Sequence, residues 1–304
     1  MILFLHAGAG SGSLWTAWEW EPGIVLPLLA SAWLYGRGLG LLWDEHVGRG
    51  IRVWEAVCFA VGWITTALAL LSPLHTLSEQ LFVAHMIQHE LLMVVAAPLL
   101  VVGRPLVPML WALPSNARRT VGRFTRHPAL QRSWGFVSLP IVAFFVHGTA
   151  IWIWHAPALY EATLTSDGVH ALQHLSFFGT ALLFWWTIIH AHAPGGRTRA
   201  VSFGTAVLLL FGTALHSGAL GALLTFSRTL WYPAYGATAG AWGLTPFEDQ
   251  QLAGLVMWIP ASLAYLVAAL FLFAGWLNAS EERVHAWEVA RDAERLHAGG
   301  NAWS

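Results

Sequence analysis

Charged residues are scarce in this 304-residue chain, and lysine is absent. Asp, Glu and Arg together make up 10% of the chain, whereas hydrophobic residues make up 57%. So little polar surface cannot cover a soluble globule of this size, which predicts an integral membrane protein with lipid as a partner. The 15 basic and 16 acidic residues nearly balance. The chain therefore offers no broad basic face, and we expect no nucleic-acid partner.

Cysteine is also nearly absent, because Cys58 is the only one in the chain. An internal disulfide or a two-thiolate metal site is thereby excluded. Any metal chemistry would depend on histidine, methionine and carboxylates. The 15 histidines are unusual in so apolar a chain, and they are the feature that calls for an explanation.

Long apolar runs predict the fold. A membrane-spanning helix needs about 20 mostly apolar residues, and seven runs of the sequence meet this requirement. We therefore predict an all-α integral membrane protein with seven transmembrane helices in a membrane domain of residues 1–277, followed by a cytoplasmic tail at 278–304. The spans are expected at about 24–43, 51–72, 81–102, 135–156, 169–190, 201–226 and 251–277.

Arginines gather in alternate connections between these runs. Loops rich in arginine stay on the cytoplasmic side of a membrane. This predicts an N-terminus outside and a C-terminus in the cytoplasm, with Arg228 as the single arginine on the outer side. The arginines assigned to the inner side are Arg37, Arg49, Arg52, Arg104, Arg118, Arg119, Arg123, Arg126, Arg132, Arg197, Arg199, Arg283, Arg291 and Arg295.

Histidines recur in pairs at the expected outer ends of two spans. His85 and His89 are four residues apart in the third span, and His170 and His174 are four apart in the fifth. Residues at this spacing share one face of a helix. Ionisable side chains inside a membrane are costly, so their presence indicates function.

Three more histidines become candidate site residues because of their expected depth in the membrane. At a rise of about 1.5 Å per residue, His147 and His216 lie near the depth of His89, and His155 lies at the outer end of its span. Imidazoles suit copper, zinc and haem iron, and a thioether within reach favours Cu(I), so copper is the first expectation. Carboxylates could neutralise the ion or orient a histidine, or one could cap the last helix. The candidate metal-site residues are His85, His89, Met86, His174, His155, His147, His216, His170, Glu90 and Asp249.

Three other functions use the same residue types. Two histidines from different spans could ligate a haem iron. A seven-span membrane hydrolase could hold zinc with three histidines, an Asp and a Ser, although no Ser or carboxylate stands out as its partner. A proton pathway would need polar residues across both leaflets, whereas the polar set here stops near mid-membrane.

Seven short segments between residues 70 and 260 together form a recognisable sequence pattern. They are 72–74 (SPL), 81–89 (LFVAHMIQH), 97–100 (APLL), 154–160 (WHAPALY), 183–186 (LFWW) preceded by His174, 232–235 (YPAY), and 249–254 (DQQLAG) followed by 257–258 (MW). In combination they resemble the CtaG family of multi-span cytochrome c oxidase assembly factors. The chain lacks the cysteine pair of the single-span copper chaperones that sometimes carry the same name.

The resemblance implies a non-enzymatic protein of the bacterial plasma membrane. It implies that the protein helps to mature a haem–copper oxidase, with cytochrome c oxidase subunits as partners, by supplying copper. The positions that match the family's recurring segments are His85, Met86, His89, His155, His174 and Asp249. The other four candidates come from depth and spacing alone.

Overall fold

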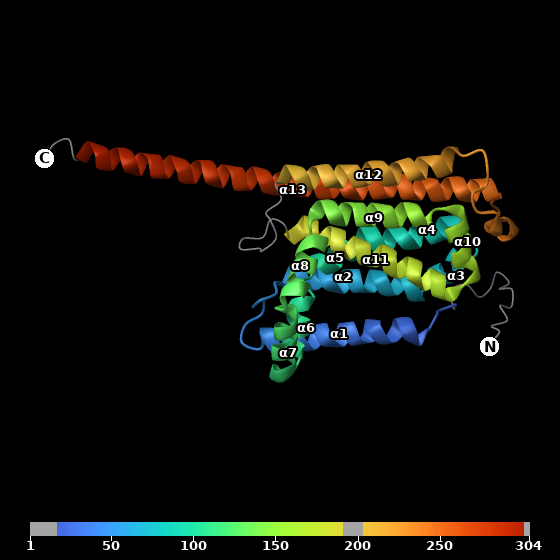
Figure 1. Cartoon of the computed structure of the whole chain (residues 1–304), viewed down its shortest axis with the longest axis horizontal. Helices are drawn as coiled ribbons and strands as arrows, with labels where there is room; N and C mark the ends of the chain where they lie inside the picture. The colour runs from blue at the N-terminus through green and yellow to red at the C-terminus, as the bar shows by residue number, and fades with distance from the viewer. Residues whose placement is uncertain (1–16, 191–202, 301–304) are drawn as a thin grey trace.

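The protein is a bundle of helices that lie side by side, as Figure 1 shows. The structure is a computed structural model that describes residues 17–190 and 203–300. Within these ranges every regular element is a helix, which confirms the predicted all-α fold. Six of the described helices are long and apolar enough to cross a membrane, and a bent pair makes a seventh if its two parts form one span. The chain is therefore a multi-pass membrane protein.

The long helices follow the predicted runs. The third run consists of α4, the π-helix η2 and α5, which join into one 21-residue helix. The elements of the runs are α1 (Pro22–Trp43), α2 (Val53–Leu71), α4 (Phe82–Glu90), η2 (Leu91–Ala96), α5 (Ala97–Val102), α11 (Asp167–His190), α12 (Phe203–Phe226) and α13 (Pro246–Gly300).

Short helices close the two ends of the bundle (Figure 1). At the end where α4 and α11 begin lie α3 (Pro73–Ser78), α10 (Pro157–Thr165), η3 (Pro233–Ala237) and η4 (Ala239–Trp242). We call this the histidine end. At the opposite end, which we call the arginine end, lie α6 (Leu106–Ala112) and α7 (Ser115–Thr125).

The predicted fourth span, 135–156, is not one straight helix. It is divided between α8 (Pro128–Val137) and α9 (Pro140–Trp154), which are bent by 67° relative to each other. A residue before a proline is disfavoured in the α conformation, and Leu139 before Pro140 is extended, with ψ 126°. The 15 residues of α9 span about 22 Å at 1.5 Å per residue. This is shorter than the roughly 30 Å of a bilayer core.

A π-helical turn interrupts the third span immediately after its histidines. It covers Leu91–Ala96 and is followed by Pro98 in α5. A proline ring clashes with the carbonyl four residues earlier, which here is Val94, and a wider turn relieves that clash. The side chains of α5 consequently point in other directions than they would if α4 continued as one regular α-helix.

Helices α12 and α13 pack against each other at two glycines. A Cβ added to Gly254 would lie 2.5 Å from the carbonyl oxygen of Gly221, closer than atoms can approach. Only glycine at these positions allows the two backbones so near. From there α13 runs past the arginine end and continues well beyond the bundle (Figure 1). The predicted tail boundary at residue 278 thus falls within a continuous helix, and residues 301–304 lie outside the described ranges.

Candidate metal centre

Three histidines from two helices face one another at the histidine end. His85 lies near the start of α4, and His170 and His174 lie on successive turns at the start of α11. One ring nitrogen of each lies within 4.8 Å of the other two. Metal–imidazole bonds of about 2.0–2.1 Å hold two ligand nitrogens at most ~4 Å apart. Small rotations of the three rings would therefore bring them within reach of one ion.

Two further imidazoles pack against these three. The ring centroid of His89 lies 4.3 Å from that of His85 and 5.1 Å from that of His174. His75 of α3 stacks on His170 with centroids 5.7 Å apart and planes only 10° from parallel. The five side chains form one group, which we call the histidine cluster: His75, His85, His89, His170 and His174.

Several nitrogens of the histidine cluster are buried without a hydrogen-bond partner among the described residues. They are both ring nitrogens of His89 and Nε2 of His170 and His174. Buried polar atoms nearly always have a partner, and a membrane interior makes an unpaired one costlier. Neutral imidazoles fit copper or zinc, whereas calcium and magnesium prefer oxygen ligands. The residues present therefore fit a transition-metal ion.

Gln88 fixes the orientation of His75. Its Nε2 donates to the carbonyl oxygen of Ala69 at 2.7 Å, and the same nitrogen lies 3.0 Å from Nδ1 of His75. Because the carbonyl can only accept, the amide nitrogen must face it, and Nδ1 of His75 then accepts the second hydrogen bond. The proton of neutral His75 consequently resides on Nε2. His75 in this state supports the cluster by stacking and has no free lone pair for a metal.

Tyr235 of η3 contacts His85 and is compatible with either tautomer of its ring. Its hydroxyl donates to the carbonyl oxygen of Ser78 at 3.1 Å and lies 3.2 Å from Nδ1 of His85. Burial raises the pKa of the Tyr235 hydroxyl well above its usual range, so the group stays protonated. When this hydroxyl donates to Ser78, it accepts from Nδ1–H of His85, which leaves a lone pair on Nε2. In the other tautomer Nε2–H donates to Oε1 of Gln173, 3.3 Å away.

Asp249 is far from α4 in sequence but binds the N-terminus of this helix, which carries His85. It is fully buried near the start of α13, and its two carboxylate oxygens accept from the backbone N–H groups of Phe82 and Val83 at 2.8 and 2.9 Å. A carboxylate at this place caps the N-terminus of α4 and complements its dipole. The sequence suggested a role at the ion or as a cap of the last helix. The observed hydrogen bonds hold α4, the helix that carries His85.

His155 lies beside the histidine cluster. Its Nδ1 is 2.7 Å from the carbonyl oxygen of Ile151, and its Nε2 is buried without a partner among the described residues. The ring of Phe177 lies 6.0 Å from that of His155 and 4.7 Å from that of His89. His155 therefore borders the cluster across an aromatic side chain.

His147 and His216 lie elsewhere. Nδ1 of His147 lies 3.0 Å from the hydroxyl of Thr180, and its ring stacks on Phe184. Nε2 of His216 lies 3.2 Å from where a Cβ on Gly148 would be. His147 thus faces α11, whereas His216 of α12 lies against α9. No ring contact joins either of them to the cluster within the described ranges.

Met86 and Glu90 are each next to a cluster histidine in sequence, and their described contacts are with other residues. Met86 is buried in the apolar core, together with Phe82 and Tyr160. Glu90 has a buried Oε2 without a hydrogen-bond partner in the part of the chain that the structure describes, and it interacts electrostatically with Tyr265 of α13. A residue next to His89 in sequence is rotated by about 100° on a helix, so Glu90 faces another neighbour.

Most of the chain, including this site, matches a known protein family. The sequence model of a family described as cytochrome c oxidase caa3 assembly factor (Caa3_CtaG) matches residues 33–279. The chain belongs to this family. The resemblance found in the sequence is thereby confirmed, and the whole histidine cluster lies within the Caa3_CtaG match.

A further relative of this Caa3_CtaG protein is an uncharacterised protein of Mycobacterium leprae (strain TN). The two are 24% identical over 242 residues, which cover 76% of this chain and 36% of the relative. The chain thus spans about a third of the length of the curated relative that it matches. No solved structure matches the protein.

Sequence reasoning missed several residues of the Caa3_CtaG site. His75, Gln88, Gln173 and Tyr235 are not among the residues that the sequence predicts for the site. Gln88 stands within the segment between the paired histidines, and Tyr235 within the YPAY segment at 232–235. A polar side chain one turn from a histidine pair is the signal that could have identified Gln88. Nothing in the sequence indicates that Tyr235 meets His85.

Proposed function

We propose that this protein assists the assembly of cytochrome c oxidase by binding a copper ion as cargo at the histidine cluster. The observation that carries the proposal is the set of three ligand nitrogens of His85, His170 and His174 within 4.8 Å of one another. Membership of an assembly-factor family supports the oxidase as the client and a non-catalytic role.

The chemistry of the cluster supports a single ion as the cargo. The imidazole rings contact each other, with centroids of His170 and His174 4.4 Å apart and of His85 and His170 5.2 Å apart. Such mutual packing favours one ion over a haem, whose macrocycle would have to separate its two axial histidines. Imidazole nitrogens are good ligands for copper.

We further propose that the protein has seven spans, with α8 and α9 together forming the fourth, and that the histidine end faces outward from a bacterial plasma membrane. The arginine end carries α7, which holds Arg118, Arg119 and Arg123. Arginine-rich segments remain cytoplasmic. The N-terminus would then lie outside and the C-terminus inside. Cargo would be exchanged on the outer side.

The decisive experiment is elemental analysis of the purified protein together with its visible absorption spectrum. About one equivalent of copper without a Soret band supports the proposal. Iron with a Soret band would indicate haem, zinc would point to a hydrolase, and the absence of any metal after copper loading would contradict copper binding. Replacing both His85 and His89 by Ala should abolish copper binding while membrane insertion is retained.

The client is tested in cells that lack the protein. We expect oxidase polypeptides to be present with low cytochrome c oxidase activity, partly restored by added copper. Unchanged oxidase activity in the deletion strain would contradict the assembly role. Failure of the double histidine variant to restore activity, when the unsubstituted protein does restore it, would connect the metal to the assembly.

A further inference from the structure

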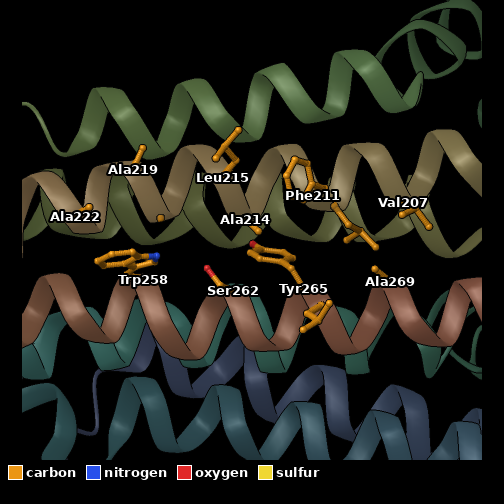
Figure 2. Close-up of a pocket in the computed structure, with 13 residues that line it drawn as sticks. Val207, Phe211, Ala214, Leu215, Ala219, Ala222, Trp258, Ser262, Tyr265 and Ala269 are labelled. Atoms are coloured by element: carbon orange, nitrogen blue, oxygen red, sulfur yellow. The ribbon is translucent and has the colours of Figure 1, made fainter.

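A second site lies outside the histidine cluster, in a groove between α12 and α13. The two helices touch at Gly221 and Gly254 and leave a groove of about 560 Å³ farther along. Its walls come from residues 207–222 of α12 and 258–269 of α13, and Figure 2 shows the side chains that line it. Phe211 and Leu215 on the rim are 63% exposed, so the groove opens to the surface of the bundle.

Three polar side chains interrupt this otherwise apolar groove. Trp258, Ser262 and Tyr265 lie on one face of α13, and Figure 2 shows the indole nitrogen and the two hydroxyl oxygens turned toward the same region. None of the three atoms has a hydrogen bond to residues 17–190 or 203–300. Tyr265 is only 3% exposed. An unpaired hydroxyl in a membrane interior is costly, so the three groups indicate a ligand that carries an oxygen.

The depth of these groups narrows the class of ligand. Ser262 lies at the middle of the apolar helix segment Pro246–Asn278, and thus near the centre of a bilayer. The polar headgroup of an ordinary phospholipid remains at the membrane surface, about 15 Å away. The matching oxygen must therefore belong to the buried part of the ligand.

The groove is long and open along one side. The lined stretch of α12 is about 22 Å long at 1.5 Å per residue, and the volume of the groove is about 560 Å³. A space of this length and volume fits a single hydrocarbon chain that lies along the helices.

We propose that the groove between α12 and α13 binds a membrane-soluble molecule with one long alkyl or prenyl chain and a hydroxyl or carbonyl oxygen within its buried part. Trp258 and Tyr265 donate hydrogen bonds to that oxygen, and Ser262 donates or accepts according to the group. Ala214, Gly218 and Ala222 form the floor along which the chain lies. The proposal is independent of copper binding at the histidine cluster.

Photolabelling of the full-length protein in lipid nanodiscs tests this proposal. The first probe is a 16-carbon chain with a mid-chain hydroxyl and a terminal diazirine, and the second is the same chain without the hydroxyl. We expect the first probe to label residues 207–222 and 258–269 about fivefold more efficiently, as two net hydrogen bonds would provide. Equal labelling of these segments by both probes would overturn the proposal.

Substitutions in the groove test the contribution of its hydrogen bonds and that of its shape separately. The triple variant Trp258→Phe, Ser262→Ala and Tyr265→Phe should equalise the two probes while both still label. Ala219→Phe, at an exposed position that lines the groove, should abolish labelling by both. Leu223→Phe, on the same helix but outside the groove, is the matched control and should leave labelling unchanged. Persistence of the hydroxyl preference in the triple variant, or in a folded Ala219→Phe protein, would contradict the proposal.

Discussion

His85 and His170 come from different helices, yet their imidazole rings lie 5.2 Å apart and only 29° from parallel. This contact joins α4 to α11 and brings the two histidine pairs of the sequence together. The ring of His174 then lies 6.0 Å from that of His85. The distance between α4 and α11 therefore determines whether the nitrogens can bind one ion.

Replacing His174 by Ala should lower copper affinity by more than the roughly 10–100-fold cost of losing a supporting hydrogen bond, because it removes one of three ligands. Competition with a copper chelator measures the affinity. His190→Ala is the matched control, since His190 ends the same helix and stacks on Trp186, away from the cluster. Equal affinities of the two variants would contradict a role of His174 as a ligand.

Replacing Tyr235 by Phe should weaken copper binding about 10–100-fold without changing the stoichiometry at saturating copper, because the metal-binding tautomer of His85 loses the hydroxyl that accepts from its Nδ1–H. Burial raises the pKa of this hydroxyl. Its neutral form then persists to higher pH, and the affinity of the unsubstituted protein should show no break near pH 10. Tyr232→Phe, which loses a hydrogen bond to the carbonyl of His155 instead, serves as the comparison. A break near pH 10 would contradict the protonated state of Tyr235.

Replacing Asp249 by Ala should lower the free energy of unfolding by about 1–3 kcal/mol, because two backbone N–H groups of α4 lose their partner. Unfolding in detergent, followed by circular dichroism, measures the change. Glu248→Ala removes the neighbouring carboxylate, which bonds only to Thr245 at an exposed position. It should therefore cost less. A cost for Asp249→Ala no larger than for Glu248→Ala would refute the capping role.

Replacing Gly254 by Ala should destabilise the fold by about 1–3 kcal/mol, because the new methyl group would collide with the backbone of α12. The same unfolding measurement applies. In contrast, a Cβ on Gly240 of η4 would meet nothing within 4 Å, so Gly240→Ala should leave stability nearly unchanged. Equal stability of the two variants would show that the helices separate easily at this contact.

Much of the fold could be predicted because spanning helices are long and apolar. The details that escaped prediction have local causes. Pro140 bends the fourth run, and the π-turn before Pro98 changes the phase of the third. Hydrophobicity averaged over a window detects neither. The tail after residue 278 has the loosely helical spacing of a surface helix, and in the structure it continues α13.

The candidate site could be predicted only along single helices. Four-residue spacing correctly placed His85 with His89 and His170 with His174 on shared faces. Depth alone grouped His147 and His216 with these four, although His147 faces α11 and His216 lies against α9. Depth along the membrane normal says nothing about the direction in which a side chain points around the helix. Contacts such as that of Tyr235 with His85 arise from how the loop at 227–245 folds back, which no local pattern encodes.

Helix α13 links three parts of the molecule that are otherwise far apart. Its first turns hold α4 through Asp249, its middle forms one wall of the groove, and its end extends past the arginine end (Figure 1). Pro260, between Trp258 and Ser262, removes one backbone hydrogen bond. The helix therefore lacks one backbone hydrogen bond where it lines the groove. A single continuous helix thus connects the N-terminus of α4, the groove and the far side of the arginine end.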